Sequence, residues 1–92
     1  MLDSPINTLQ QLMIITAEEC GELTQRCSKI VRKYENFDQI EEEQRAKFAE
    51  EAGDVYCMLE LLIEHNITNW DELKERASYK RKKLETWSTL IE

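Results

Sequence analysis

The sequence contains little of what tight turns are made from: it has one proline and two glycines among 92 residues. It also lacks the alternation of apolar and polar residues that indicates β-strands. Apolar residues make up 41% of the chain and charged residues 34%, which suits a folded helical protein and is too apolar for a disordered one. Because a single core is already hard to complete at this length, we expect one all-α domain over residues 1–92.

Several classes of function lack their usual support in the sequence. No uninterrupted apolar run is long enough to cross a bilayer, and the N-terminus has no basic region of the kind that opens a signal peptide. The formal net charge of -7 disfavours a general affinity for nucleic acid or for anionic membranes. We therefore expect a cytoplasmic protein that binds neither nucleic acid nor a membrane.

The cysteines show no pattern that indicates a disulfide framework or a zinc site. Cys20, Cys27 and Cys57 are odd in number, so they cannot all pair, and none belongs to a CxxC motif. All three fall within apolar stripes, and we expect small buried hydrophobic residues in a reducing compartment. The single histidine, His65, lies beside a turn and is a poor candidate for a catalytic base.

Apolar residues recur at helical spacing in three segments, which are separated by the polar stretches ENFDQ and HNIT. We therefore expect a bundle of three main helices. The expected limits are the N-cap Ser4 and the first helical residue Pro5 to residue 33 or 34, residues 41–65, and a capping box of Thr68 and Asp71 towards the C-terminal end.

The second expected helix is apolar beyond its main stripe, at Cys57, Met58 and Leu61. Three helices of this length cannot wrap a full core by themselves, and a surplus apolar face needs a partner. We therefore expect oligomerisation, as a homodimer or a homotetramer, to complete the bundle. Tyr56 lies on the apolar side of the same helix and is expected in the core.

Two acidic phrases, AEECGEL and AEEAGDV, place acids three residues apart: Glu19 with Glu22, and Glu51 with Asp54. At about 100° per residue, each pair lies on the shoulder of an apolar stripe, so packing the two stripes together turns all four carboxylates towards a common space. Such a group repels itself unless a cation holds it, and oxygen ligands suit Mg²⁺ or Mn²⁺ rather than zinc. The alternative is that the acids are merely solvated, as acidic pairs on helices commonly are.

The only two glycines, Gly21 and Gly53, stand before the last acid of each phrase, inside the expected helices. A glycine in a helix interior costs about 1 kcal/mol relative to alanine. A small residue at these places would permit close approach of the helices or leave room for a ligand, which favours a functional role for the two phrases.

Basic residues accompany the acids along the same helices. Arg26 lies in the strip of the first acid pair with Lys29 near its edge, Lys47 is one turn before Glu51, and the segment YKRKKLE contains Lys80 and Lys83. Carboxylates that hold a metal, flanked by Lys and Arg, are what a polyphosphate substrate needs. The alternative for the basic segment is a solvated helix end that complements the helix dipole.

Together the two phrases resemble the signature of the MazG-like, all-α nucleoside triphosphate pyrophosphatases, which is EExxE followed after a gap by ExxD. Here the signature reads EECGE at residues 18–22 and EAGD at residues 51–54, and the resemblance extends over about residues 9–62. It implies Mg²⁺-dependent hydrolysis of a (deoxy)nucleoside triphosphate between the α- and β-phosphates, to a nucleoside monophosphate and pyrophosphate. It also implies a dimer or a tetramer.

The resemblance implies roles for the matching residues. Glu19, Glu22, Glu51 and Asp54 would ligate Mg²⁺, with Mn²⁺ as the alternative, and Glu18 or Glu22 would accept the proton of the attacking water. The residues implied for phosphate binding are Lys47, Lys80 and Lys83, with Arg26, Lys29 or a neighbouring subunit in place of a family lysine that is Ile15 here. The candidates for stacking on the nucleobase, in or near the first connection, are Tyr34 and Phe37.

Three alternatives stay open at this point. A phosphoribosyl-ATP pyrophosphatase has similar acidic motifs, although its second motif is typically richer in alanine. The chain could instead be a non-catalytic helical interaction module, similar to an antitoxin, or a degenerate family member that binds a nucleotide without hydrolysing it. None of these patterns identifies the base or the sugar of the nucleotide.

Overall fold

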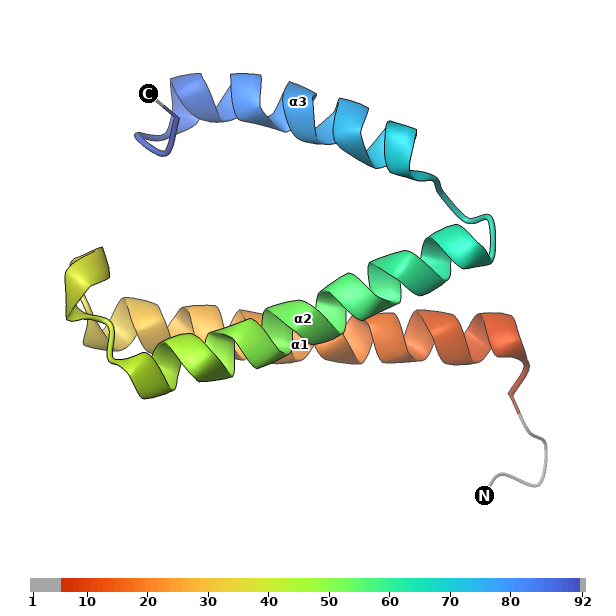
Figure 1. Ribbon diagram of the computed structural model, residues 1–92, viewed down its shortest axis with the longest axis horizontal. Helices are drawn as coiled ribbons and strands as arrows, with labels where there is room; N and C mark the ends of the chain where they lie inside the picture. Colours follow the sequence, from red (N-terminus) through yellow and green to blue (C-terminus); the bar gives the residue numbers. More distant parts are fainter. Residues whose placement is uncertain (1–5, 92) are drawn as a thin grey trace. The chain divides into compact units, whose positions relative to one another are not determined.

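The structure is a computed structural model that describes residues 6–91. It is all-helical over these residues, as the sequence predicts, with α1 (Thr8–Lys33), a short 3-10 helix η1 (Phe37–Gln39), α2 (Glu42–Glu64) and α3 (Trp70–Trp87), shown in Figure 1. The chain forms two compact units, Met1–Leu61 and Leu62–Glu92. The first holds α1, η1 and most of α2, and the second holds the end of α2 with α3.

The start of α1 differs from the sequence prediction. Asn7 is the N-cap: its side chain accepts a hydrogen bond from the Gln10 backbone at 2.8 Å, and the Gln10 side chain accepts one from the Asn7 backbone at 3.0 Å. This reciprocal pair satisfies two amide groups that the helix itself leaves unbonded, which explains a start at Thr8. Ser4 and Pro5, the predicted N-cap and first helical residue, lie outside the described residues.

The end of α1 is tied to the start of α2. Tyr34 closes α1, as expected, by donating its backbone N–H to the Ile30 carbonyl at 2.9 Å. Two contacts then converge on one carboxylate oxygen: Lys33 Nζ lies 2.8 Å from Glu41 Oε1, and the Tyr34 hydroxyl donates to the same oxygen at 3.0 Å. The connection between the helices is therefore short and held at both ends.

Arg45 holds the middle of that connection. Its guanidinium donates hydrogen bonds to the carbonyl oxygens of Phe37 and Ile40, the latter at 3.3 Å. Phe37 is the first residue of η1 and Ile40 follows its last, so a side chain of α2 fixes the path of the segment that precedes it. This clamp positions the start of α2 relative to the end of α1 and hence the two acidic phrases relative to each other.

In the segment between α2 and α3, a residue in the left-handed conformation ends α2 and an asparagine side chain caps the start of α3. Asn66 has a φ of 61°, and the N–H groups of Asn66 and Ile67 donate to the carbonyls of Ile63 and Leu62, which is the Schellman pattern. Asn69 is the N-cap of α3 and accepts the Glu72 N–H at 2.9 Å. The predicted capping box of residues 68 and 71 is wrong by one residue.

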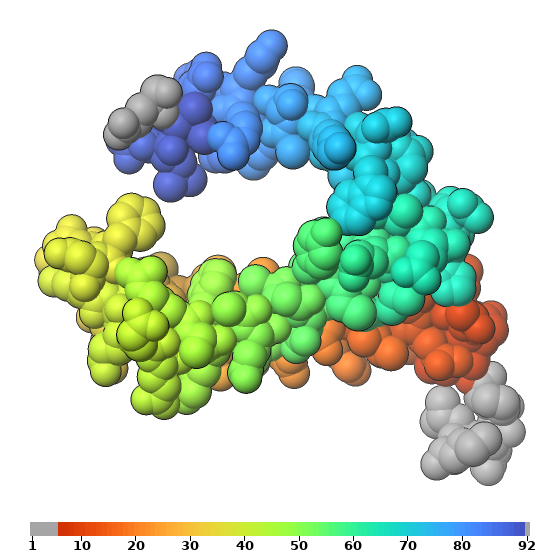
Figure 2. Space-filling view, viewed as in Figure 1, coloured from red at the N-terminus to blue at the C-terminus, as the bar shows by residue number. Residues whose placement is uncertain are grey.

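The core of the α1–α2 pair is a narrow seam. Helix α2 lies in front of α1 in the space-filling view (Figure 2), and Leu12 and Met58, each 6% exposed, are the only buried hydrophobic residues among those described. Met58, expected beside the main stripe, is thus central to the seam. The large apolar side chains that stay exposed are Leu9, Met13, Ile14, Ile15, Val31, Phe37, Tyr56, Ile67, Trp70, Tyr79, Trp87 and Leu90.

Two predictions about buried residues are wrong. Cys20, Cys27 and Cys57 are all exposed, and Tyr56 is 53% exposed rather than part of the core. The reason is geometric: two packed helices cover only the middle of each apolar stripe, so residues at the stripe's edge keep contact with solvent. Among the described residues, none of the helices has the length and apolar character needed to span a bilayer.

Candidate metal centre

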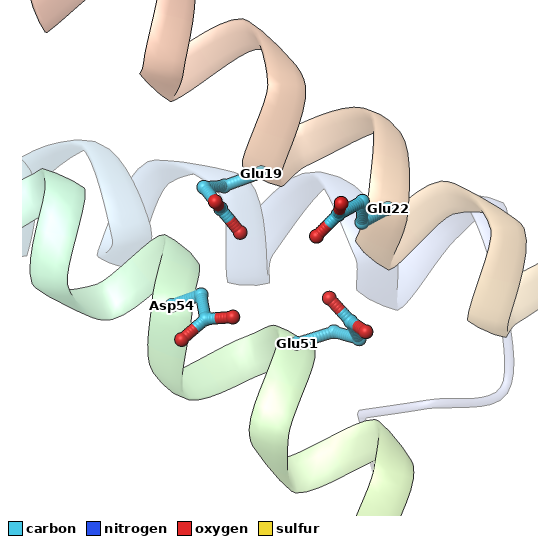
Figure 3. Close-up of side chains that lie close together, drawn as sticks. All are labelled: Glu19, Glu22, Glu51 and Asp54. Atoms are coloured by element: carbon cyan, nitrogen blue, oxygen red, sulfur yellow. The ribbon is translucent and has the colours of Figure 1, made fainter.

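Helices α1 and α2 bring four carboxylates to one place, as the spacing of the acids predicts. Glu19 and Glu22 come from α1, Glu51 and Asp54 come from α2, and one oxygen of each lies within 4.8 Å of one oxygen of every other (Figure 3). The three-residue spacing puts each pair on one helix face, and the packing of the two faces makes the pairs meet. We call these four residues the acidic cluster.

Two oxygens of the acidic cluster are buried without a hydrogen bond. Glu19 Oε2 and Glu51 Oε2 are shielded from solvent and receive no hydrogen bond within the described part of the chain. Glu19 and Glu51 are half-buried, whereas Glu22 and Asp54 are exposed and leave one side of the cluster open to solvent. Because a buried carboxylate oxygen without a donor is costly, this arrangement calls for a cation or a proton.

Electrostatics within the acidic cluster act most strongly on Glu51. Burial raises the pKa of its carboxyl group above the usual 4.5, and a hydrogen bond with Glu22, which one of the two groups can donate only when protonated, raises it further. Repulsion from Glu22 and Asp54 acts in the same direction, and the charge of Arg26 lowers this pKa. The metal-free cluster therefore retains a proton at Glu51 to a higher pH than an isolated carboxyl group would.

The donor set fits a hard divalent cation. All four groups offer carboxylate oxygens, and neither a cysteine nor His65 belongs to the cluster. One oxygen of each group lies within 4.8 Å of one oxygen of every other, so all four carboxylates could contribute to holding a single ion of this kind. Oxygen ligands without imidazole or thiolate favour Mg²⁺ or Mn²⁺ over zinc.

The glycines of the two phrases do not mediate a close approach within the chain. A Cβ atom built on Gly21 or Gly53 would meet no other atom within 4 Å. Of the two expected reasons for a small residue, close helix contact is therefore not found here. What remains is open space beside the last acid of each phrase.

The predicted phosphate-binding residues are only partly gathered at the acidic cluster. Arg26 contacts it, with Nε 3.9 Å from Glu51 Oε1. Lys47 instead pairs with Glu43 at 3.2 Å, and Lys29 is exposed on α1. Lys80 and Lys83 belong to α3 in the second unit, where the Lys83 ammonium lies 5.2 Å from the centre of the Tyr79 ring.

The remaining predicted residues lie around the cluster and the first connection. Glu18 is exposed and outside the four-carboxylate group, next to Glu19. Tyr34 and Phe37 both line a cavity of about 210 Å³ at the connection, and Phe37 also lines a neighbouring one of about 360 Å³. The larger cavity was not predicted. Its other lining residues are Ile30, Ile40, Gln44, Arg45, Phe48 and Ala49.

The chain matches no protein-family model, no curated protein and no solved structure. The resemblance to the MazG-like pyrophosphatases rests on the two acidic motifs and their spacing. The four acids of those motifs that the resemblance assigns to the metal are the four that the fold brings together.

Proposed function

We propose that this protein is a divalent-cation-dependent nucleoside triphosphate pyrophosphohydrolase that resembles the MazG-like enzymes. The observation that supports this best is the acidic cluster, in which Glu19 and Glu51 each hold a buried oxygen without a hydrogen bond. Solvated acids would turn such oxygens to water, whereas a metal-binding set keeps them inward. The motif resemblance supports a polyphosphate substrate, because the MazG-like enzymes with similar acidic motifs hydrolyse nucleoside triphosphates.

The proposed division of labour follows from burial and charge. When bound, Mg²⁺ or Mn²⁺ supplies charge stabilisation for the polyphosphate oxygens. Glu19 and Glu51 would hold the ion from the more buried side of the cluster, and Glu22 and Asp54 would hold it from the exposed side. Glu18, exposed and outside the group of four, stays available as a proton acceptor, with Glu22 as the alternative.

The reaction consumes one water molecule for each nucleotide. The water oxygen forms a bond to phosphorus, the bridging bond between the α- and β-phosphates breaks, and the proton released by the water passes to the carboxylate of Glu18 or Glu22. The products are a nucleoside monophosphate and pyrophosphate. Arg26, Lys29 and Lys47 of the first unit supply positive charge to the phosphates.

Oligomerisation and location are part of the same proposal. A single chain leaves many large apolar side chains exposed, among them Ile14, Ile15 and Tyr56. Burial of this surface against further copies of the chain would add the core that the α1–α2 seam lacks. We propose a homodimer or a homotetramer that acts in the cytoplasm on free nucleotides.

A panel of nucleoside triphosphates incubated with Mg²⁺ tests this proposal and ranks the bases. Pyrophosphate and orthophosphate are quantified separately for the wild type, for Glu51→Gln and for Glu50→Gln. Glu50 is an exposed neighbour outside the acidic cluster, so it controls for the loss of one acidic charge on the same helix. Pyrophosphate from the wild type and Glu50→Gln, but not from Glu51→Gln, supports the proposal, and no product from any nucleotide contradicts it.

A further inference from the structure

One of the three ion pairs in the described part of the chain joins a basic residue to the acidic cluster, through Arg26 and Glu51. The side chains of Arg26 and Glu51 are 21% and 17% exposed, whereas Lys33 with Glu41 and Lys47 with Glu43 are each more than 40% exposed. A partly buried pair is screened less by water and salt than a surface pair. The charge of Arg26 therefore acts on the cluster more strongly than an ordinary surface contact would.

The contact between Arg26 and Glu51 is electrostatic rather than a hydrogen bond. The 3.9 Å between Nε and Oε1 exceeds hydrogen-bond length, so the guanidinium contributes positive charge without being locked in one geometry. A guanidinium also keeps its charge at every pH at which the protein folds. Arg26 is thus always charged, but its contact with the four carboxylates is loose enough for another cation to replace it.

Something must offset the repulsion among four carboxylates when no metal is bound. Within the described residues, Arg26 provides the positive charge that is in contact with the cluster, and it does so at Glu51, one of the two acids with a buried unpaired oxygen. A divalent cation would use the same carboxylate and would repel the guanidinium. The guanidinium of Arg26 and a divalent cation therefore weaken each other's interaction with the cluster.

We infer that Arg26 is the counter-cation of the unloaded acidic cluster and competes with the divalent cation for Glu51. The inference rests on the proposed function in one respect, namely that the cluster binds a metal. Metal entry displaces the guanidinium, which then becomes available to a phosphate group. Arg26 is in this sense a positioning residue that couples the loading of the site to the capture of its substrate.

Titration of nucleotide-free protein with MnCl₂, followed calorimetrically, tests the competition without any catalytic readout. The variants are Arg26→Gln, Arg26→Lys, which keeps the charge, and Arg32→Gln, which removes the same charge from an exposed position on α1. We expect Arg26→Gln to bind Mn²⁺ about tenfold more tightly than the wild type, because a nearby positive charge is lost. Arg26→Lys and Arg32→Gln are expected to stay within about twofold of the wild type.

The outcomes separate this inference from the proposed function. Unchanged or weaker Mn²⁺ binding by Arg26→Gln, or equal tightening by Arg32→Gln, contradicts the competition even if the wild type hydrolyses nucleotides. An absence of Mn²⁺ binding by the wild type contradicts the metal-dependent function, and the competition with it. Circular dichroism of each variant establishes that its helices are intact before the affinities are compared.

Discussion

The Glu22 carboxyl group on α1 faces the Glu51 carboxyl group on α2 across the seam between the two helices (Figure 3). Glu22 is exposed, whereas Glu51 is half-buried and has one oxygen that is shielded from solvent without a hydrogen bond. The pKa of Glu51 is raised by burial first and then by Glu22. Acids placed in this way destabilise the metal-free fold and favour the binding of a cation.

Divalent cations are expected to stabilise the folded chain. Binding to the native state alone adds RT ln(1 + [L]/Kd), about 2.7 kcal/mol when the cation is at 100 times its Kd. The melting temperature of the wild type should therefore rise with added Mg²⁺ or Mn²⁺, and that of Glu51→Gln should not. Glu50→Gln, outside the acidic cluster, should respond as the wild type does. An equal rise in the melting temperature of all three proteins would show that the stabilising cation binds outside the acidic cluster.

The free energy of unfolding of the metal-free protein is expected to fall as the pH rises through the pKa of Glu51. The folded pKa of Glu51 lies above the usual value of 4.5, so its contribution is fully present below 4.5 and is lost as the pH rises through the raised pKa. Urea denaturation in EDTA at a series of pH values measures this. Glu51→Gln should flatten the decline and, at neutral pH, exceed the wild type in stability.

Glu41 provides the control of opposite sign. Its pKa is lowered, first by the Lys33 hydrogen bond and then by the Tyr34 hydrogen bond, so its contribution is present above 4.5 and is lost as the pH falls through the lowered pKa. Glu41→Gln should therefore lower the stability above pH 4.5 by a constant amount and flatten the acid limb of the same curve, without changing the slope that is due to Glu51. If the loss of stability with rising pH persists in Glu51→Gln, the titration of another group causes it.

Replacing either helix glycine with alanine is expected to stabilise the chain. Nothing lies within 4 Å of the Cβ that Gly21→Ala or Gly53→Ala would add, so the change brings helix propensity without a clash. The expected gain is about 1 kcal/mol at each position, measured by chemical denaturation. A loss of stability instead would show that another copy of the chain or a ligand packs against these positions.

Asn69 and Thr68 separate the observed cap of α3 from the predicted one. Asn69→Ala removes the oxygen that accepts the Glu72 N–H and is expected to cost about 1 kcal/mol of unfolding free energy. Thr68→Ala should cost less, because Thr68 is not the N-cap. Equal losses in a denaturation experiment would contradict the assignment of the cap.

The helices and the meeting of the acids could be predicted from the sequence because both depend on angular spacing. Glu19, Glu22, Glu51 and Asp54 occupy the shoulders of two apolar stripes, so packing of those stripes turns the four side chains towards a common space. The contact of Arg26 was also signalled, since it lies one turn after Glu22 in the same strip. The direction of these side chains follows from the spacing alone, whereas the level at which the two pairs meet depends on the connection that Arg45 holds.

Burial and caps were less predictable, for two physical reasons. A helical wheel gives the direction of Cys20 or Tyr56 but not the width of the neighbour that covers it, and here the neighbour covers only a narrow seam. At the helix starts, adjacent residues compete as caps: Asn69 prevails over Thr68, and Asn7 caps α1. The choice depends on backbone geometry that the residue types leave open. The cavity beside Arg45 depends on the path of the connection, which carries no periodic signal.

The most direct test of the central claim is ³¹P NMR of a deoxynucleoside triphosphate incubated with the wild-type protein and Mg²⁺. Cleavage between the α- and β-phosphates at the acidic cluster predicts equal amounts of nucleoside monophosphate and pyrophosphate, formed by Glu50→Gln as well but not by Glu51→Gln. A nucleoside diphosphate with orthophosphate, or the same products from Glu51→Gln at the wild-type rate, would contradict it.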